Sequence, residues 1–189
     1  MRTHVALLRG VNVGGRGRLP MADLREAVLS LGHRDVTTYV QSGNVVLAGA
    51  VDDPAEVAAG IARALTERTP LSPDVVVLTR EGLAAVVAGN PFPDEHEPTR
   101  LHAGFVQGGV GPQAPAAVAD AVERARAKGS PDEACVVGGT LYLHTPDGLG
   151  RSELAAQLTR RAVVTACGGP ITLRNWATVT RLLAMLDDD

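Results

Sequence analysis

The chain has 189 residues, of which 45% are hydrophobic and 21% charged, and its formal net charge is -3. This composition is typical of a packed globular protein and excludes wholesale disorder, and no apolar run is long enough for a membrane span. A general nucleic-acid binder usually has a basic pI, which this chain lacks. The early charged residues argue against a signal peptide, and Cys135 and Cys167 form no CxxC pattern. We therefore expect a cytoplasmic protein without a disulfide scaffold.

The first half of the chain alternates strand and helix patterns. An apolar run at 4–8 predicts a strand, and Pro20 opens a helix that should end at Gly32. Further elements are expected as a strand at 36–40, a tight turn at 41–44, a strand at 45–47, a helix from Pro54 and a strand at 75–78. This order, β-α-β-β-α-β, is that of the ferredoxin-like split unit.

The second half repeats this order. Strands are predicted at 101–106, 134–137, 141–144 and 171–173, and helices from Pro115, over 152–166 and from Trp176. We therefore predict an α+β fold of two ferredoxin-like βαββαβ subdomains (alpha-beta plaits) plus a C-terminal helix. The expected boundaries are 1–80 for subdomain 1, 81–99 for a connecting helix and loop, and 100–189 for subdomain 2 with its C-terminal helix. The internal duplication is inferred from element order alone.

A glycine-rich loop follows the first strand, and such a loop can hold an anion on its backbone N–H groups. Gly10 and Gly15 have the spacing of a P-loop, but Arg16 replaces the required Lys and Gly17 the magnesium-binding Ser or Thr. We therefore reject a nucleoside triphosphatase. Two interpretations stay open: Arg9 and the loop bind an anionic group, or the glycines serve turn geometry alone.

Three further segments carry polar residues at the ends of predicted elements. Turn geometry explains Gly43 and Asn44 but not Gln41 and Ser42, whose side chains suit a polar ligand. Farther along the chain, Ser152 and Asn175 are placed to cap helices. Arg151, next to Ser152, would make a good anion contact. Helix capping does not explain Arg174, which precedes Asn175.

These side chains favour binding over acid–base chemistry. Arginines and amides bind phosphate, carboxylate or a polar heterocycle well, but they are poor general acids and bases. The five histidines share no metal-ligand spacing, and we expect the acidic stretch around His96 to be a solvated loop. No metal site is predicted, and the sequence identifies neither a cofactor nor a catalytic residue. The candidate ligand-binding residues are Arg9, Gly10, Asn12, Gly14, Gly15, Gln41, Ser42, Asn44, Arg151, Ser152, Arg174 and Asn175.

The chain resembles an uncharacterised bacterial family, domain of unknown function 1697. The resemblance is carried by the segments 6–15, 21–25, 31–32, 38–46, 90–92, 148–152 and 174–179 and by Tyr142. It implies paired ferredoxin-like subdomains and no established reaction, cofactor or partner. The chain departs from the common pattern at 15–18 and at Glu153, where other members often carry Lys.

Three functions remain open on the sequence alone. The preferred one is a binding protein, or an enzyme of unknown reaction, that holds an anionic or nucleotide-like small ligand. The alternative is a nucleic-acid-binding module that uses the ferredoxin-like sheet, and it needs exposed aromatic residues such as Tyr39 and Tyr142. The third is a protein–protein or dimerisation scaffold, which predicts an exposed apolar patch.

Overall fold

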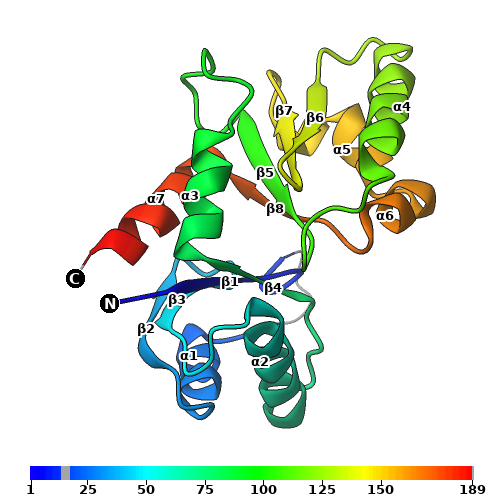
Figure 1. Ribbon diagram of the computed structural model, residues 1–189. Helices are drawn as coiled ribbons and strands as arrows, with labels where there is room; N and C mark the ends of the chain where they lie inside the picture. The colour runs from blue at the N-terminus through cyan, green and yellow to red at the C-terminus, as the bar shows by residue number, and fades with distance from the viewer. Residues whose placement is uncertain (14–17, 189) are drawn as a thin grey trace. The chain divides into compact units, whose positions relative to one another are not determined.

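The computed structural model describes residues 1–13 and 18–188 (Figure 1). The chain divides into two compact units. Unit 1 comprises residues 1–84 and 181–189, and unit 2 comprises residues 85–180. Helices α3 (Arg80–Ala88) and α7 (Trp176–Asp187) contribute residues to both units. None of the helices in the described ranges has both the length and the apolar character needed to span a bilayer.

Unit 1 contains a four-stranded antiparallel sheet with the strand order β2-β3-β1-β4. Two helices cover one face of it (Figure 1). The elements are β1 (His4–Leu8), α1 (Met21–Leu29), β2 (Arg34–Tyr39), β3 (Asn44–Ala48), α2 (Pro54–Arg68) and β4 (Val75–Thr79). Because side chains alternate along a strand, Ala6 and Leu8 pack against the helices with Leu24 and Ile61. The side chains of Val5 and Leu7 on the other face are apolar and buried too, so β1 is buried along its whole length.

Unit 2 has a sheet of the equivalent strand order, β6-β7-β5-β8. Its helices α4, α5 and α6 pack on one face, where Leu141 and Leu143 of β7 join their core. The elements are β5 (Leu101–Phe105), α4 (Ala114–Arg126), β6 (Glu133–Val137), β7 (Thr140–His144), the 3-10 turn η1 (Leu149–Arg151), α5 (Glu153–Leu158), α6 (Arg161–Cys167) and β8 (Thr172–Asn175). The predicted α+β fold of two ferredoxin-like units with a C-terminal helix is therefore confirmed.

The single helix predicted over 152–166 is wrong, because the structure contains two helices there. α5 ends at Leu158, and Arg160 has an extended backbone before α6 begins. The Thr159 hydroxyl donates to the Ala156 carbonyl over 2.8 Å. A threonine hydroxyl that bonds a backbone carbonyl competes with the helical ladder, which is a local reason for the break.

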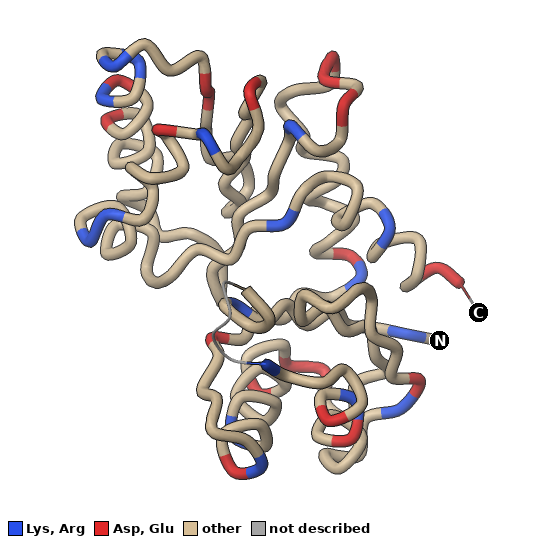
Figure 2. The backbone as a smooth tube through the Cα atoms, turned by 180° about the vertical axis from the view of Figure 1, so that it is seen from behind, with Lys and Arg blue, Asp and Glu red and all other residues tan. Residues whose placement is uncertain are grey.

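Charged residues are distributed over both units. Figure 2 shows basic and acidic positions interspersed along the backbone of each unit. The ion pairs found among the described residues are mostly exposed; for example, Arg126 and Glu123 form an i,i+3 pair at 2.6 Å on α4. Exposed pairs of this kind contribute about 0–1 kcal/mol to stability.

Candidate functional site

The glycine-rich loop and the β2–β3 hairpin meet in unit 1. The Leu8 backbone N–H donates to the Gly43 carbonyl over 2.8 Å. The Asn12 side-chain amide donates to the carbonyls of Gln41 and Leu19, each over 2.9 Å, and its Oδ1 accepts from the Leu19 N–H over 2.8 Å. Asn12 therefore fixes the start of the loop, its return at Leu19 and the hairpin relative to one another.

These two segments also concentrate left-handed backbone conformations. Gly10, Asn12 and Gly43 have φ values of 72°, 56° and 72°, and Val40 has a φ of 48°. Glycine and asparagine tolerate this region, but for other L-residues it costs about 1–2 kcal/mol, and a β-branched residue there is an outlier. Strain of this kind persists only where the surrounding structure enforces it, and it clusters at functional sites.

The surface formed here carries positive charge, an amide and apolar groups. We call Arg9, Gly10, Val13, Val40 and Gln41 the loop–hairpin surface; all five residues are exposed. Arg9 contacts the Asp74 carboxylate at 3.6 Å, and both side chains are about half exposed. Val13 and Val40 are 64% and 54% exposed. Each valine is next in sequence to a residue of the Asn12–Gln41 hydrogen bond.

Two other residues predicted for the site hold the hairpin together from within. Asn44 is completely buried, and its side-chain amide donates to the Tyr39 carbonyl over 3.2 Å and to the Ser42 hydroxyl over 2.9 Å. Ser42 and Asn44 therefore stabilise the hairpin that carries Gln41. Gly14 and Gly15 lie outside the described residues.

The predicted residues Arg151 and Ser152 lie in unit 2, at an open pocket of 260 Å³. Residues 128–132, 147–148 and 151–153 line it. The Ser152 hydroxyl accepts from the Ala155 N–H over 2.8 Å, which confirms the predicted helix cap. The same hydroxyl donates to the Asp132 carboxylate over 2.8 Å. Arg151 is exposed at the pocket.

This pocket carries charges of both signs. Lys128 forms an ion pair with Glu153 at 2.6 Å. Asp132 is buried and accepts from the hydroxyls of both Ser130 and Ser152. Asp147 is a third carboxylate in the pocket lining. The lining therefore contains three carboxylates beside the cations Lys128 and Arg151. An anion would meet a weaker positive potential there than at a purely basic pocket.

Arg174 and Asn175 end strand β8. The Asn175 side-chain oxygen accepts from the Thr178 N–H over 2.9 Å, so Asn175 caps α7 as predicted. Arg174 is half-buried and donates to the Leu173 carbonyl over 2.9 Å. Burial lowers the pKa of Arg174 to about 10, so it stays charged at neutral pH. The structure thus places Arg9, Gly10, Asn12 and Gln41 together in unit 1, whereas Arg151, Ser152, Arg174 and Asn175 belong to unit 2.

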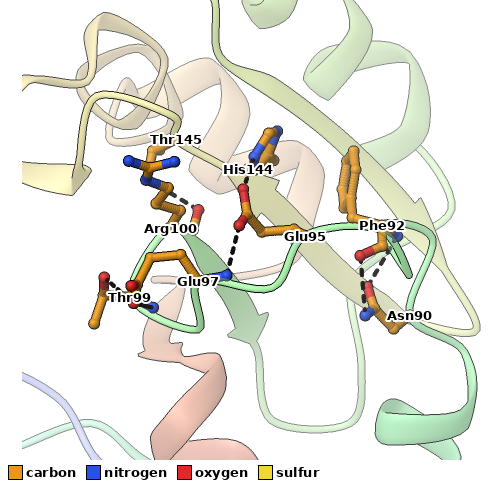
Figure 3. Close-up of polar contacts among 8 residues, drawn as sticks. All are labelled: Asn90, Phe92, Glu95, Glu97, Thr99, Arg100, His144 and Thr145. Carbon is orange, nitrogen blue, oxygen red and sulfur yellow. Dashed lines mark hydrogen bonds and ion pairs between the residues drawn. The ribbon is translucent and has the colours of Figure 1, made fainter.

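A histidine–carboxylate pair in unit 2 was missed by the sequence prediction (Figure 3). His144 Nε2 lies 2.7 Å from Glu95 Oε2, and the two side chains are only 19% and 14% exposed. The Phe92 ring lies against the imidazole, with 5.4 Å between ring centroids. The expectation of a fully solvated acidic loop is therefore wrong for Glu95. The partners are 49 residues apart, and no local pattern relates them.

The pKa of Glu95 is lowered, first by the hydrogen bond from the Glu97 N–H and then by the bond to His144. A carboxyl whose pKa is lowered by folding stabilises the folded state above its unfolded pKa, about 4.3, and that contribution is lost as the pH falls through the folded value. Replacing Glu95 by Gln should therefore lower stability at neutral pH, and the difference from wild type should vanish in acid. Urea unfolding from pH 7 to pH 3 measures this.

The exposed carboxylate of Asp94 in the same loop provides the matched control. The Asp94→Asn variant removes this exposed carboxylate and should leave stability at neutral pH unchanged. A constant difference between wild type and Glu95→Gln at every pH would show that the ionised Glu95 carboxylate contributes nothing to folding.

Comparison with known proteins agrees with this architecture. The model of the family described as "Protein of unknown function (DUF1697)" matches residues 1–142. No curated protein matches the chain. Among solved structures, the conserved bacterial protein SP0830 from Streptococcus pneumoniae is similar, with a TM-score of 0.70, 21% identity and coverage of 98% of each chain. At this identity the likeness shows the fold alone. With three quarters of its length matched by the family model, the chain belongs to the DUF1697 family.

Proposed function

We propose that this protein binds a small anionic ligand at the loop–hairpin surface of unit 1. The observation that carries the proposal is the Asn12 side chain, whose three hydrogen bonds join the start of the glycine-rich loop to Leu19 and to the hairpin. A loop that served only to connect β1 to α1 would not need a fixed register with Gln41. Preorganisation of this kind reduces the entropic cost of binding.

The charges at this surface favour an anion. The ion pair of Arg9 with Asp74 is long and about half exposed, so it contributes little and leaves the guanidinium able to bind a phosphate or carboxylate bidentately. Arg18 is also exposed and precedes Leu19, which Asn12 holds. Gly10 is exposed and has no side chain, so a ligand can approach its backbone closely.

The remaining features suggest the other part of the ligand. Val13 and Val40 expose methyl groups beside the Asn12–Gln41 bond, and the Gln41 side chain can both donate and accept hydrogen bonds. A phosphate or carboxylate joined to a flat polar ring would use all of these groups. We therefore infer a nucleotide-like ligand. Ser42 and Asn44 would act as positioning residues, because the hydrogen bond between their side chains stabilises the hairpin that carries Gln41.

The predicted site residues of unit 2 give weaker support for anion binding. Ser152 and Asn175 already cap helices, and the pocket beside Arg151 contains three carboxylates. We treat the Arg151 pocket as the second candidate position for the anion. Nucleic-acid binding has less support, because Tyr142 is 1% exposed and its hydroxyl donates to the Val86 carbonyl over 2.7 Å. A buried ring offers no surface on which a base can stack.

A thermal-shift screen with nucleoside phosphates, sugar phosphates and dicarboxylates tests the proposal. A ligand present at 100 times its Kd adds about 2.7 kcal/mol, which corresponds to a rise of roughly 5–10 °C in the midpoint for a chain of this size. Arg9→Gln should abolish the shift. Arg151→Gln, which removes an exposed arginine from unit 2, is the matched control and should keep it. If Arg151→Gln alone removes the shift, the ligand binds in the unit 2 pocket and the proposal is wrong.

A further inference from the structure

Strand β6 forms an edge of the unit 2 sheet. In the described part of the chain it pairs with β7 alone, and the register from Glu133↔His144 to Val137↔Thr140 contains no shift. The equivalent strand of unit 1, β2, is interrupted by a register shift between Arg34 and Thr37. A bulge of that kind protects an edge strand from pairing with another chain. β6 lacks this protection.

The side chains of β6 do not protect it either. Its sequence is Glu-Ala-Cys-Val-Val, without proline or lysine, the residues that commonly block pairing at an edge. Val137 at its end is 40% exposed. A regular and mostly apolar edge presents a row of backbone groups to a further strand.

The turn after β6 fixes which backbone groups face outward. Gly138 and Gly139 have φ values of 55° and 81°, as a two-residue type I′ hairpin turn requires. In such a hairpin the residues flanking the turn, Val137 and Thr140, exchange hydrogen bonds with each other. Hydrogen-bonded and non-hydrogen-bonded residue pairs alternate along an antiparallel strand pair. The N–H and C=O groups of Ala134 and Val136 therefore point away from β7.

We propose that β6 pairs antiparallel with β6 of a second copy of this chain, about a two-fold axis at Cys135. In this register Ala134 of each copy exchanges hydrogen bonds with Val136 of the other. Glu133 lies opposite Val137 of the other copy, so no like charges face each other across the pair. The edge can therefore pair with an identical edge without opposing like charges, as a two-fold interface requires, and we take a second copy of this chain as the occupant.

The expected dimer is weak. One strand pair of five residues buries less than a standard stable interface. Association should therefore depend on protein concentration, and single charges at the edge should change its Kd measurably. The exposed Val137 side chain is the best position for such a charge, because its replacement leaves the core of unit 2 intact.

Sedimentation equilibrium of the full chain tests the proposal. Val137→Glu places a carboxylate opposite Glu133 twice per dimer and should raise the dimer Kd about 2- to 30-fold, whereas Val137→Lys should lower it by a similar factor. Val51→Glu is the matched control, since Val51 is 41% exposed in unit 1, and it should leave the Kd unchanged. Thermal unfolding checks that each variant is folded.

Two results would overturn the proposal. One is a wild-type chain that remains monomeric up to about 1 mM, a concentration at which even very weak self-association is visible. The other is a dimer whose Kd responds alike to Val137→Glu and Val137→Lys, which would place the contact away from β6.

Discussion

Replacing Gly43 by alanine is expected to destabilise unit 1 by about 2–5 kcal/mol. Two costs add at this position. The backbone has a φ of 72°, which any L-residue adopts only with strain. A Cβ atom would also lie 2.6 Å from Val11 Cγ2 and 2.8 Å from Leu8 Cβ, closer than packed atoms allow. Urea unfolding of the variant measures the loss.

Gly10→Ala is the control that separates these costs. Gly10 has the same φ of 72°, but a Cβ there would meet nothing within 4 Å. Its replacement should cost only the conformational part, about 1–2 kcal/mol. Equal destabilisation by Gly10→Ala and Gly43→Ala would contradict the close approach of the hairpin to β1 and to the loop, on which the candidate site depends.

Replacing Asn12 by alanine should destabilise the chain by about 2–4 kcal/mol and abolish ligand binding. The variant loses three hydrogen bonds and leaves the N–H of buried Leu19 without its acceptor. It also puts alanine at a φ of 56°. The free energy of unfolding from urea titration gives the stability, and the thermal shift gives the binding.

Two further variants assign the effect of Asn12. Asn12→Gly removes the amide but accepts the left-handed backbone, so it should be about 1 kcal/mol more stable than Asn12→Ala. Asn12→Asp keeps the acceptor for Leu19 but places a carboxylate oxygen against the carbonyl oxygens of Leu19 and Gln41, so it should not restore wild-type stability. Wild-type stability and binding in Asn12→Gly would mean that the amide does not organise the site.

The fold could be predicted from the sequence because its determinants are local. Apolar runs at strand length, prolines at helix starts and paired glycines at turns gave the element order of both units, and this order restricts the topology strongly. The two helix caps, Ser152 and Asn175, were also predicted, because a cap and its helix are adjacent in the chain.

Contacts between distant residues could not be predicted in this way. Asn12 was predicted to be a ligand-binding residue, but its bond to the Gln41 carbonyl spans 29 residues, so the link that it makes between loop and hairpin could not be predicted. Glu95 appeared in the sequence as one acid of a charged loop, although it lies largely buried against His144. Burial and pairing arise from tertiary packing, for which residue type alone gives no signal.

The central claim, an anion site at the loop–hairpin surface, is tested most directly by an NMR titration of the 15N-labelled chain with inorganic phosphate and with a nucleoside monophosphate. Chemical-shift changes should concentrate on the backbone amides of residues 10–13 and 41–43, and should be larger for the nucleotide, because it also covers Val13 and Val40. Changes confined to residues 128–132, 147–148 and 151–153, which line the unit 2 pocket, would contradict the claim, as would the absence of any saturable change.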